Sequence, residues 1–281
     1  GNTAQRAEQQ KGCEGVPIFY PELLTSTAYH HQRKPPQDWY DAAFILPHEA
    51  LRVELGHMKS NMNSISLATE KWRVDNFAKW LHEWFVPCVH MHHGAEERTY
   101  FPWLKSRIED GEYPPRTAKQ HIDIVNLLDE IDIMSTKLAK AFQTQDIPEM
   151  EASMARMKEL IDEFVPVTLE HLEEEETLFS PLLQKHFTRA EEQVIRKQII
   201  EEGGGYEAQV FLPSIYCALE NWATPAFRSE FVEEIPAKYR SKFLKYYVPE
   251  YKDVWCLIRD APTGARKPPR TPRYPQNAYR H

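Results

Sequence analysis

Histidine and glutamate occur four positions apart in two distant stretches of the sequence. His92 precedes Glu96 in "HMHHGAEERTYFP" (90–102), and His171 precedes Glu175 in "LEHLEEEETLFSP" (169–181). In an α-helix this spacing places the imidazole and the carboxylate on one face, one turn apart, where both can reach the same metal ion. The same residues also occur on helices that simply face water, so the pattern needs support from the rest of the chain.

A comparison of the two stretches selects one histidine from the cluster at 90–93. Residues 81–104 align with residues 160–183 without a gap, and a Phe-Val-Pro triplet and a later proline fall in step. Moving the alignment by one position, so that His93 meets His171, loses the triplet and both prolines. The alignment therefore favours His92 as the counterpart of His171.

The helical pattern of each stretch leads to the same choice. The second stretch has an apolar stripe at steps of three and four, formed by Leu160, Phe164, Val167, His171, Glu175, Leu178 and Leu182. The matching stripe of the first stretch is Leu81, Phe85, Cys88, His92, Glu96, Thr99 and Trp103. His90 and His93 are expected to leave this stripe. Ionisable groups on a core-facing stripe are costly to bury unless they are paired or bind metal.

Two further predicted helices each carry one histidine where the core-facing positions are otherwise apolar, at His48 and His121. The predicted metal ligands are therefore His48, His92, Glu96, His121, His171 and Glu175. Two divalent ions, bridged by the two carboxylates and each bound by two imidazoles, would use this set fully. Such ligands suit iron, with manganese or zinc as substitutes, whereas the absence of thiolate ligands disfavours structural zinc.

Long helical patterns and short breaks organise the chain around these residues. Four helices are predicted, at about 40–66, 70–108, 117–143 and 148–187. With short connections they form an antiparallel bundle, and the fold class is all-α. The helix pairs one–two and three–four are interpreted as two copies of one helical hairpin. The predicted division is an extended segment at 1–38, the bundle at 39–189, and an extension at 190–281.

The extension is expected to be helical and to pack on the bundle. A polar helix near 190–202 ends at Gly203-Gly204-Gly205, which predicts a hinge because no phosphate-loop residues follow. Residues 206–258 are rich in aromatic side chains and predict more helices. The tail from Pro262 is rich in proline and arginine and is expected to be extended or disordered.

Composition narrows the functional classes. The 281 residues carry a net charge of −8, so nucleic acid is not an expected partner. The four scattered cysteines favour a reducing compartment, and no apolar run has the length of a membrane span, so the cytoplasm is the expected location. The motifs HExxH and GxSxG and a glycine-rich dinucleotide loop are absent.

The chain resembles the hemerythrin-like (HHE cation-binding) family over about residues 40–187. The resemblance rests on His48, on His121, and on the two HxxxE pairs with the Tyr-Phe-Pro and Leu-Phe-Ser-Pro segments that follow them. It implies an up-down-up-down four-helix bundle that holds a non-haem di-iron centre.

This sequence departs from the oxygen-carrying members, which have a further histidine where Val125 stands. The resemblance is therefore greater to the iron- and oxygen-sensing members. A fifth donor could come from His93 or Glu176, each next to a predicted ligand.

Two functions follow from this interpretation. The first is a binding protein that holds or responds to dioxygen, nitric oxide or iron. The second is a di-iron oxidoreductase or oxygenase that acts on an unknown small molecule. An enzyme needs a roomy, partly apolar cavity that reaches the metals, whereas a sensor needs only a narrow path. A metal-free helical scaffold is disfavoured, because six buried ionisable groups would have to satisfy one another.

Overall fold

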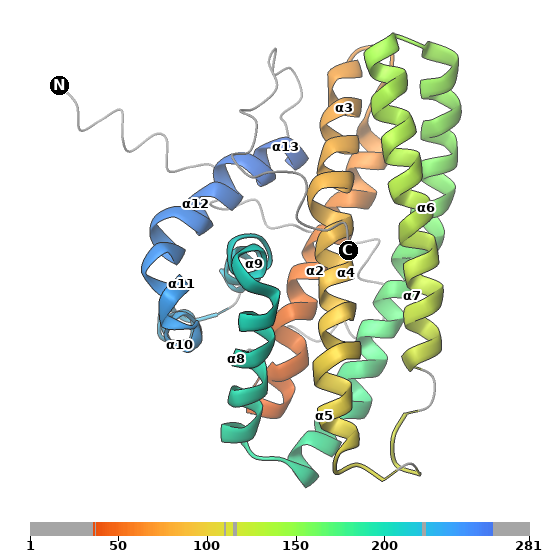
Figure 1. The fold of residues 1–281 in the computed structure, drawn as a ribbon. Coiled ribbons are helices and arrows are strands. Elements are labelled where there is room, and N and C mark those ends of the chain that lie inside the picture. The colour runs from red at the N-terminus through yellow and green to blue at the C-terminus, as the bar shows by residue number, and fades with distance from the viewer. Residues whose placement is uncertain (1–35, 37, 110, 115–116, 221–222, 261–281) are drawn as a thin grey trace, which may run out of the picture.

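The computed structural model describes residues 36, 38–109, 111–114, 117–220 and 223–260, and all regular structure in these ranges is helical. Four long helical segments lie side by side (Figure 1). They are α2 (Trp39–Ser64), a continuous run from α3 (Lys71–Trp80) through α4 (Val86–Ala95) to α5 (Phe101–Lys105), α6 (Thr117–Thr144) and α7 (Ile147–His186). The all-α prediction is confirmed, and the four predicted ranges agree with these bounds to within a few residues. Most of the predicted extended segment at 1–38 and the whole tail from Pro262 lie outside the described residues.

The repeated residues of the two aligned stretches meet in the core. α7 packs against both α2 and α6, and α3 packs against α6. Phe85 and Phe164, which occupy the same place in the alignment, contact each other with ring centroids 6.1 Å apart. Further along, Phe179 stacks on Phe44 at 5.4 Å, and Tyr100 meets the same Phe44 ring edge-on at 5.4 Å. The aligned stretches therefore occupy related positions on the two sides of one core.

Four π-helical turns each come just before a proline. They are η1 (Leu81–Phe85) before Pro87, η2 (Glu96–Tyr100) before Pro102, η3 (Glu207–Phe211) before Pro213 and η4 (Phe243–Tyr247) before Pro249. Proline has no N–H, and its ring crowds the carbonyl four residues earlier. A wider turn relieves that crowding, and such turns are frequent near functional sites. α7 contains Pro166 and Pro181 within an unbroken α-helix, so the two aligned helices differ in their local winding.

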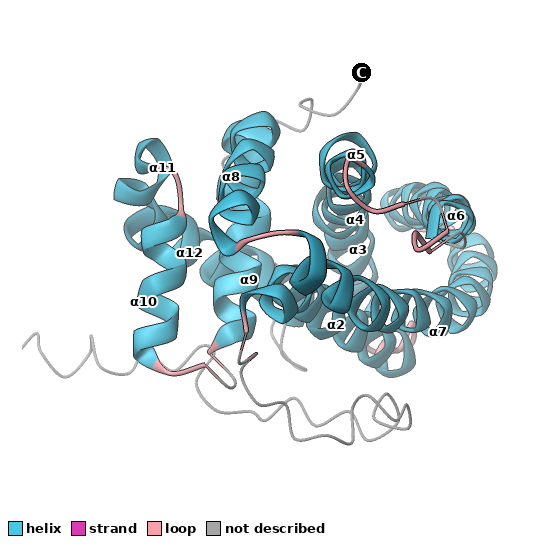
Figure 2. Cartoon of the chain, turned by 90° about the horizontal axis from the view of Figure 1, so that it is seen from below, coloured by secondary structure: helices cyan, strands magenta, loops and turns pink. Residues whose placement is uncertain are grey.

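The extension covers one side of the long helices. It consists of α8 (Arg189–Tyr206), η3, α9 (Leu212–Leu219), α10 (Pro225–Glu234), α11 (Ala237–Lys242), η4, α12 (Val248–Glu250), η5 (Tyr251–Trp255) and α13 (Cys256–Asp260). α8 and α9 pack against α2, and α8 and η3 also contact α4, so α6 and α7 lie on the far side (Figures 1 and 2). The predicted glycine hinge is confirmed as a kink at Gly204, whose φ of 67° is readily adopted only by glycine.

Two details of the predicted stripes are wrong. Leu178 is 42% exposed, and Phe179 and Leu183 take the core positions instead. With 3.6 residues per turn, steps of three and steps of four both stay near one face of a helix. After Glu175 the buried positions follow steps of four, so they fall one residue later than predicted. His93, which was expected to leave the stripe, is buried.

None of the described helices is long and apolar enough to cross a membrane.

Candidate metal centre

The four long helical segments bring all six predicted ligands to one buried place. α2 supplies one histidine, the α3–α5 run supplies one HxxxE pair, α6 supplies one histidine, and α7 supplies the other pair. Every one of these residues is buried, with at most 6% of its surface exposed. In chain order they are His48, His92, Glu96, His121, His171 and Glu175. Burial of six ionisable groups at one point is the costly arrangement that a metal centre would explain.

Glu96 faces histidines from three helices. Its Oε1 lies 3.4 Å from Nε2 of His92 and 3.9 Å from Nε2 of His48. Its Oε2 lies 3.6 Å from Nε2 of His121 on the other side. One carboxylate oxygen thus points to the His48–His92 side and the other to the α6 side, as expected of a carboxylate placed between two ions.

Glu175 repeats this arrangement from the opposite helix. Its Oε2 lies 3.3 Å from Nε2 of His48. Its Oε1 lies 3.3 Å from Nε2 of His121 and 3.4 Å from Nε2 of His171. The two carboxylates therefore stand between two groups of imidazoles.

His93 joins the second group of imidazoles. It is 3% exposed, and its ring centroid lies 4.4 Å from that of His121 and 5.4 Å from that of His171. Ligand atoms of these three histidines lie within 4.8 Å of one another, as do those of the group His48, His92, Glu96 and Glu175. The five histidines divide into two on one side and three on the other.

His93 is buried although it lies off the apolar stripe, because α4 buries more than one narrow face. α4 contacts α6 on one side and α8 and η3 on the other. His92 consequently lies near Phe211 of the extension, with centroids 6.0 Å apart, while its neighbour His93 turns toward α6 and α7. Two features of the sequence could have indicated that His93 is buried. They are the adjacent histidines His92 and His93, and the aromatic extension, whose apolar side chains need a surface of the bundle to pack against.

Glu176, the other residue considered as a fifth donor, contacts the ring nitrogen of His48 that faces away from the site. Its Oε1 lies 3.0 Å from Nδ1 of His48, and both of its oxygens accept hydrogen bonds from Arg52 at 2.6 and 2.8 Å. Glu97, which aligns with Glu176, lies 2.8 Å from Nδ1 of His121. Each carboxylate can accept a hydrogen bond from Nδ1–H, and that tautomer leaves Nε2 free to bind metal.

Glu97→Gln and Glu176→Gln are each expected to weaken metal binding by about 10- to 100-fold, because such supporting carboxylates orient the imidazole and increase its basicity. Competition with a metallochromic chelator measures the affinity. Glu163→Gln, on an exposed position of α7, is the matched control and should bind metal as the unaltered chain does. Unchanged affinity in both test variants would contradict this role.

Seven buried nitrogen and oxygen atoms of these side chains lack hydrogen-bond partners. They are Nε2 of His48 and His92, both ring nitrogens of His93, Oε2 of Glu96 and both carboxylate oxygens of Glu175. Buried polar atoms in proteins are nearly always paired, so a converging set without partners needs an explanation. Nε2 of His121 and Nε2 of His171 lie 3.0 Å apart, which is roughly the separation of two neighbouring ligands on one ion at about 2.1 Å each. The residues fit a pair of metal ions.

Burial and the neighbouring carboxylates shift the pKa values of the site's histidines in opposite directions. Burial lowers the pKa of His48, but three neighbouring carboxylates outweigh burial and raise it to about 10. At His121 burial is likewise outweighed by the carboxylates, of which Glu175 has the largest effect, and the pKa rises to about 9. Burial holds the pKa values of His92 and His93 well below the usual range. The raised pKa values of His48 and His121 favour their protonated forms, so protons compete with a metal ion for these nitrogens.

Three other histidines, His57, His82 and His90, lie outside the site and pair with aspartates. Nδ1 of His82 lies 2.7 Å from Asp132, and Nε2 of His90 lies 3.0 Å from Asp129, both on the partly exposed surface of α6. His57 lies 2.9 Å from Asp260 of the extension.

Helices that gather imidazoles and carboxylates at one buried point define a class of α-helical metal-binding proteins. The family model of the hemerythrin HHE cation binding domain matches residues 42–183, about half of the 281 residues, and the chain belongs to this family. The family binds metal ions, usually iron. Neither the curated proteins nor the solved structures include one that matches this chain.

Proposed function

We propose that this protein binds two iron ions at a carboxylate-bridged centre and that the centre binds, or responds to, dioxygen or nitric oxide. The observation that carries the proposal is the position of Glu96 and Glu175 between two groups of histidines. The contacts of α7 with α2 and α6, and of α3 with α6, support the up-down-up-down bundle that such a centre needs. Residues 39–189 would form this unit, and residues 190–281 the extension.

The residues assign unequal roles to the two metal positions. His48 and His92 would hold one ion, and His93, His121 and His171 the other, with Glu96 and Glu175 between them. When bound, iron would supply reversible redox chemistry and sites for a small exogenous ligand. The side with two imidazoles has fewer protein donors, so the exogenous ligand is expected there. Glu176 and Glu97 would keep His48 and His121 oriented while that ligand binds and leaves.

Metal analysis and optical spectroscopy of the full chain test the proposal. About two iron ions per chain are expected after loading with ferrous iron without oxygen, and the spectrum should change when dioxygen or nitric oxide is added. Fewer than about one ion per chain would contradict the di-iron proposal. A loaded centre whose spectrum ignores dioxygen, peroxide and nitric oxide would contradict ligand binding. Loading with manganese or zinc shows whether the site prefers iron.

A di-iron oxidoreductase acting on a small molecule is the second candidate. It is favoured by a cavity of about 320 Å³ that has His92 and Glu96 in its wall. A protein that only senses a diatomic gas needs no space of this size beside its metals. The two candidates are separated by whether an organic molecule occupies this cavity.

A further inference from the structure

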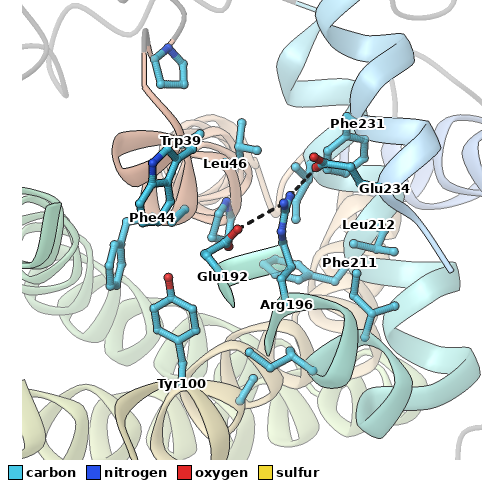
Figure 3. Close-up of a pocket in the computed structure, with 18 of the residues that line it drawn as sticks. Trp39, Phe44, Leu46, Tyr100, Glu192, Arg196, Phe211, Leu212, Phe231 and Glu234 are labelled. Atoms are coloured by element: carbon cyan, nitrogen blue, oxygen red, sulfur yellow. Dashed lines mark hydrogen bonds and ion pairs between the residues drawn. The ribbon is translucent and has the colours of Figure 1, made fainter. Parts of the chain in front are cut away.

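The cavity lies between the long helices and the extension (Figure 3). α2 contributes Trp39, Phe44 and Leu46, while the extension contributes Phe211, Leu212 and Phe231. The volume of about 320 Å³ is at the lower end of the range for small-molecule sites. Most of the wall is aromatic or aliphatic, and such a wall favours an apolar occupant.

Among the described residues that line the cavity, no arginine is left unpaired for an anionic molecule. Arg196 lies between Glu192 and Glu234, at 3.3 and 2.7 Å (Figure 3). Arg189, the other arginine of the lining, contacts Glu230 and Glu234. Because glutamates already neutralise both arginines, a carboxylate or phosphate in this part of the cavity would find no free side-chain counter-charge among the described lining residues. An uncharged molecule fits the cavity better.

Tyr100 supplies one polar group without a partner. The residue is 6% exposed, and its hydroxyl makes no hydrogen bond although it is buried. Figure 3 shows the phenol reaching from its helix toward the cavity. The aligned residue on α7 is Phe179, which packs against Phe44 as Tyr100 does, so packing alone does not require the hydroxyl. Tyr100 follows Glu96 by about one helical turn, and its hydroxyl is available to a hydrogen-bonding group of a bound molecule.

We propose that this cavity binds an uncharged, largely apolar organic molecule whose single polar group hydrogen-bonds to the Tyr100 hydroxyl beside the metal centre. The wall that includes His92 and Glu96 would place part of the molecule next to the ions. The inference rests on the proposed function only in placing metal ions next to the bound molecule. Binding of the molecule itself depends on the cavity wall and on Tyr100. The inference identifies the substrate class that the second candidate function would need.

Fluorescence titration of the full, zinc-loaded chain with 1-aminoanthracene, an uncharged aromatic probe, tests occupancy. One probe per chain is expected, and the anionic probe 1-anilinonaphthalene-8-sulfonate should bind at least about tenfold more weakly. Leu212→Trp narrows the cavity and should weaken 1-aminoanthracene binding by about tenfold or more. Val194→Trp places the same side chain on an exposed position of α8 and should leave binding unchanged. If Leu212→Trp lowers the melting temperature, Phe231→Trp is used in its place to narrow the cavity, because it changes the side-chain volume less.

Displacement of the probe by 2-naphthol and by naphthalene tests Tyr100. Tyr100→Phe should weaken 2-naphthol by about three- to tenfold, the usual effect of one hydrogen bond, and should leave naphthalene unchanged. Equal binding to the narrowed and unaltered cavities, or a preference for the anionic probe, would overturn the inference. Metal content measured on the same samples separates the two proposals. If the chain holds two ions but does not bind the probe, only the proposal of a binding cavity is overturned. If the probe binds in the cavity but the chain retains no metal, only the proposal of a metal centre is overturned.

Discussion

Glu175→Gln is expected to weaken binding of both proposed metal ions by at least about 100-fold, more than loss of either supporting carboxylate would. Glu175 is fully buried, and its two oxygens face His48 on one side and His121 on the other. An amide has nearly the same shape but carries no charge, so the helix should remain folded while the shared ligand is lost. Elemental analysis of the purified full chain measures the result.

Glu170→Gln is the matched control for this substitution, because Glu170 is an exposed glutamate on the same helix. It should retain the full metal content and the same thermal stability in the metal-free form. The double variant His92→Ala with His171→Ala removes one nitrogen from each side and should also lose the metal. Full occupancy in Glu175→Gln would show that this carboxylate is not shared between two ions.

Arg259→Leu is expected to lower the free energy of unfolding by about 3–5 kcal/mol, the usual effect of removing one partner of a buried ion pair. Arg259 lies in α13, and its Nη1 donates to Oε1 of Glu54 on α2 at 2.6 Å. Tyr251 also donates to Glu54, and Nδ2 of Asn61 donates to the carbonyl of Arg259 at 2.8 Å. Without the guanidinium, the carboxylate of Glu54, which is 1% exposed, stays buried without its cation.

Thermal and urea denaturation of the metal-free chain measure this loss, which corresponds to a fall in Tm of roughly 6 to 20 °C. Arg156→Leu is the control, since Arg156 is an exposed residue that pairs with Glu130 and Glu159 on the surface. Exposed pairs of this kind contribute about 0–1 kcal/mol, so its Tm should hardly change. Equal effects of the two substitutions would show that the extension is not held to α2 by this pair.

The sequence was sufficient to predict the long helices and the six residues that converge between them. Two features made this possible. Periodicity places His171 and Glu175 on the core-facing side of α7 whatever the details of packing, and the alignment carries that placement to His92 and Glu96. Within each HxxxE pair the two residues are four positions apart on one helix, where the backbone fixes their relative geometry.

The position of His93 could not be predicted in the same way, because it depends on what covers the outer side of α4. α8 and η3 cover it, so His92 is buried beside Phe211 and His93 faces His121. The cavity beside Tyr100 has the same origin. Its wall combines the first turns of α2 with helices more than one hundred residues away in sequence, and no local pattern indicates which aromatic residues will meet.

The supporting carboxylates cross between the two predicted hairpins. Glu97 of the first hairpin holds His121 of the second, and Glu176 of the second holds His48 of the first. Neither hairpin contains a supporting carboxylate for its own first histidine. A single hairpin with one histidine and one HxxxEE segment would therefore complete this arrangement only by pairing with a second copy of itself. The present chain has the contact pattern of such a two-fold dimer joined into one polypeptide, in which each half depends on the other for the orientation of a ligand.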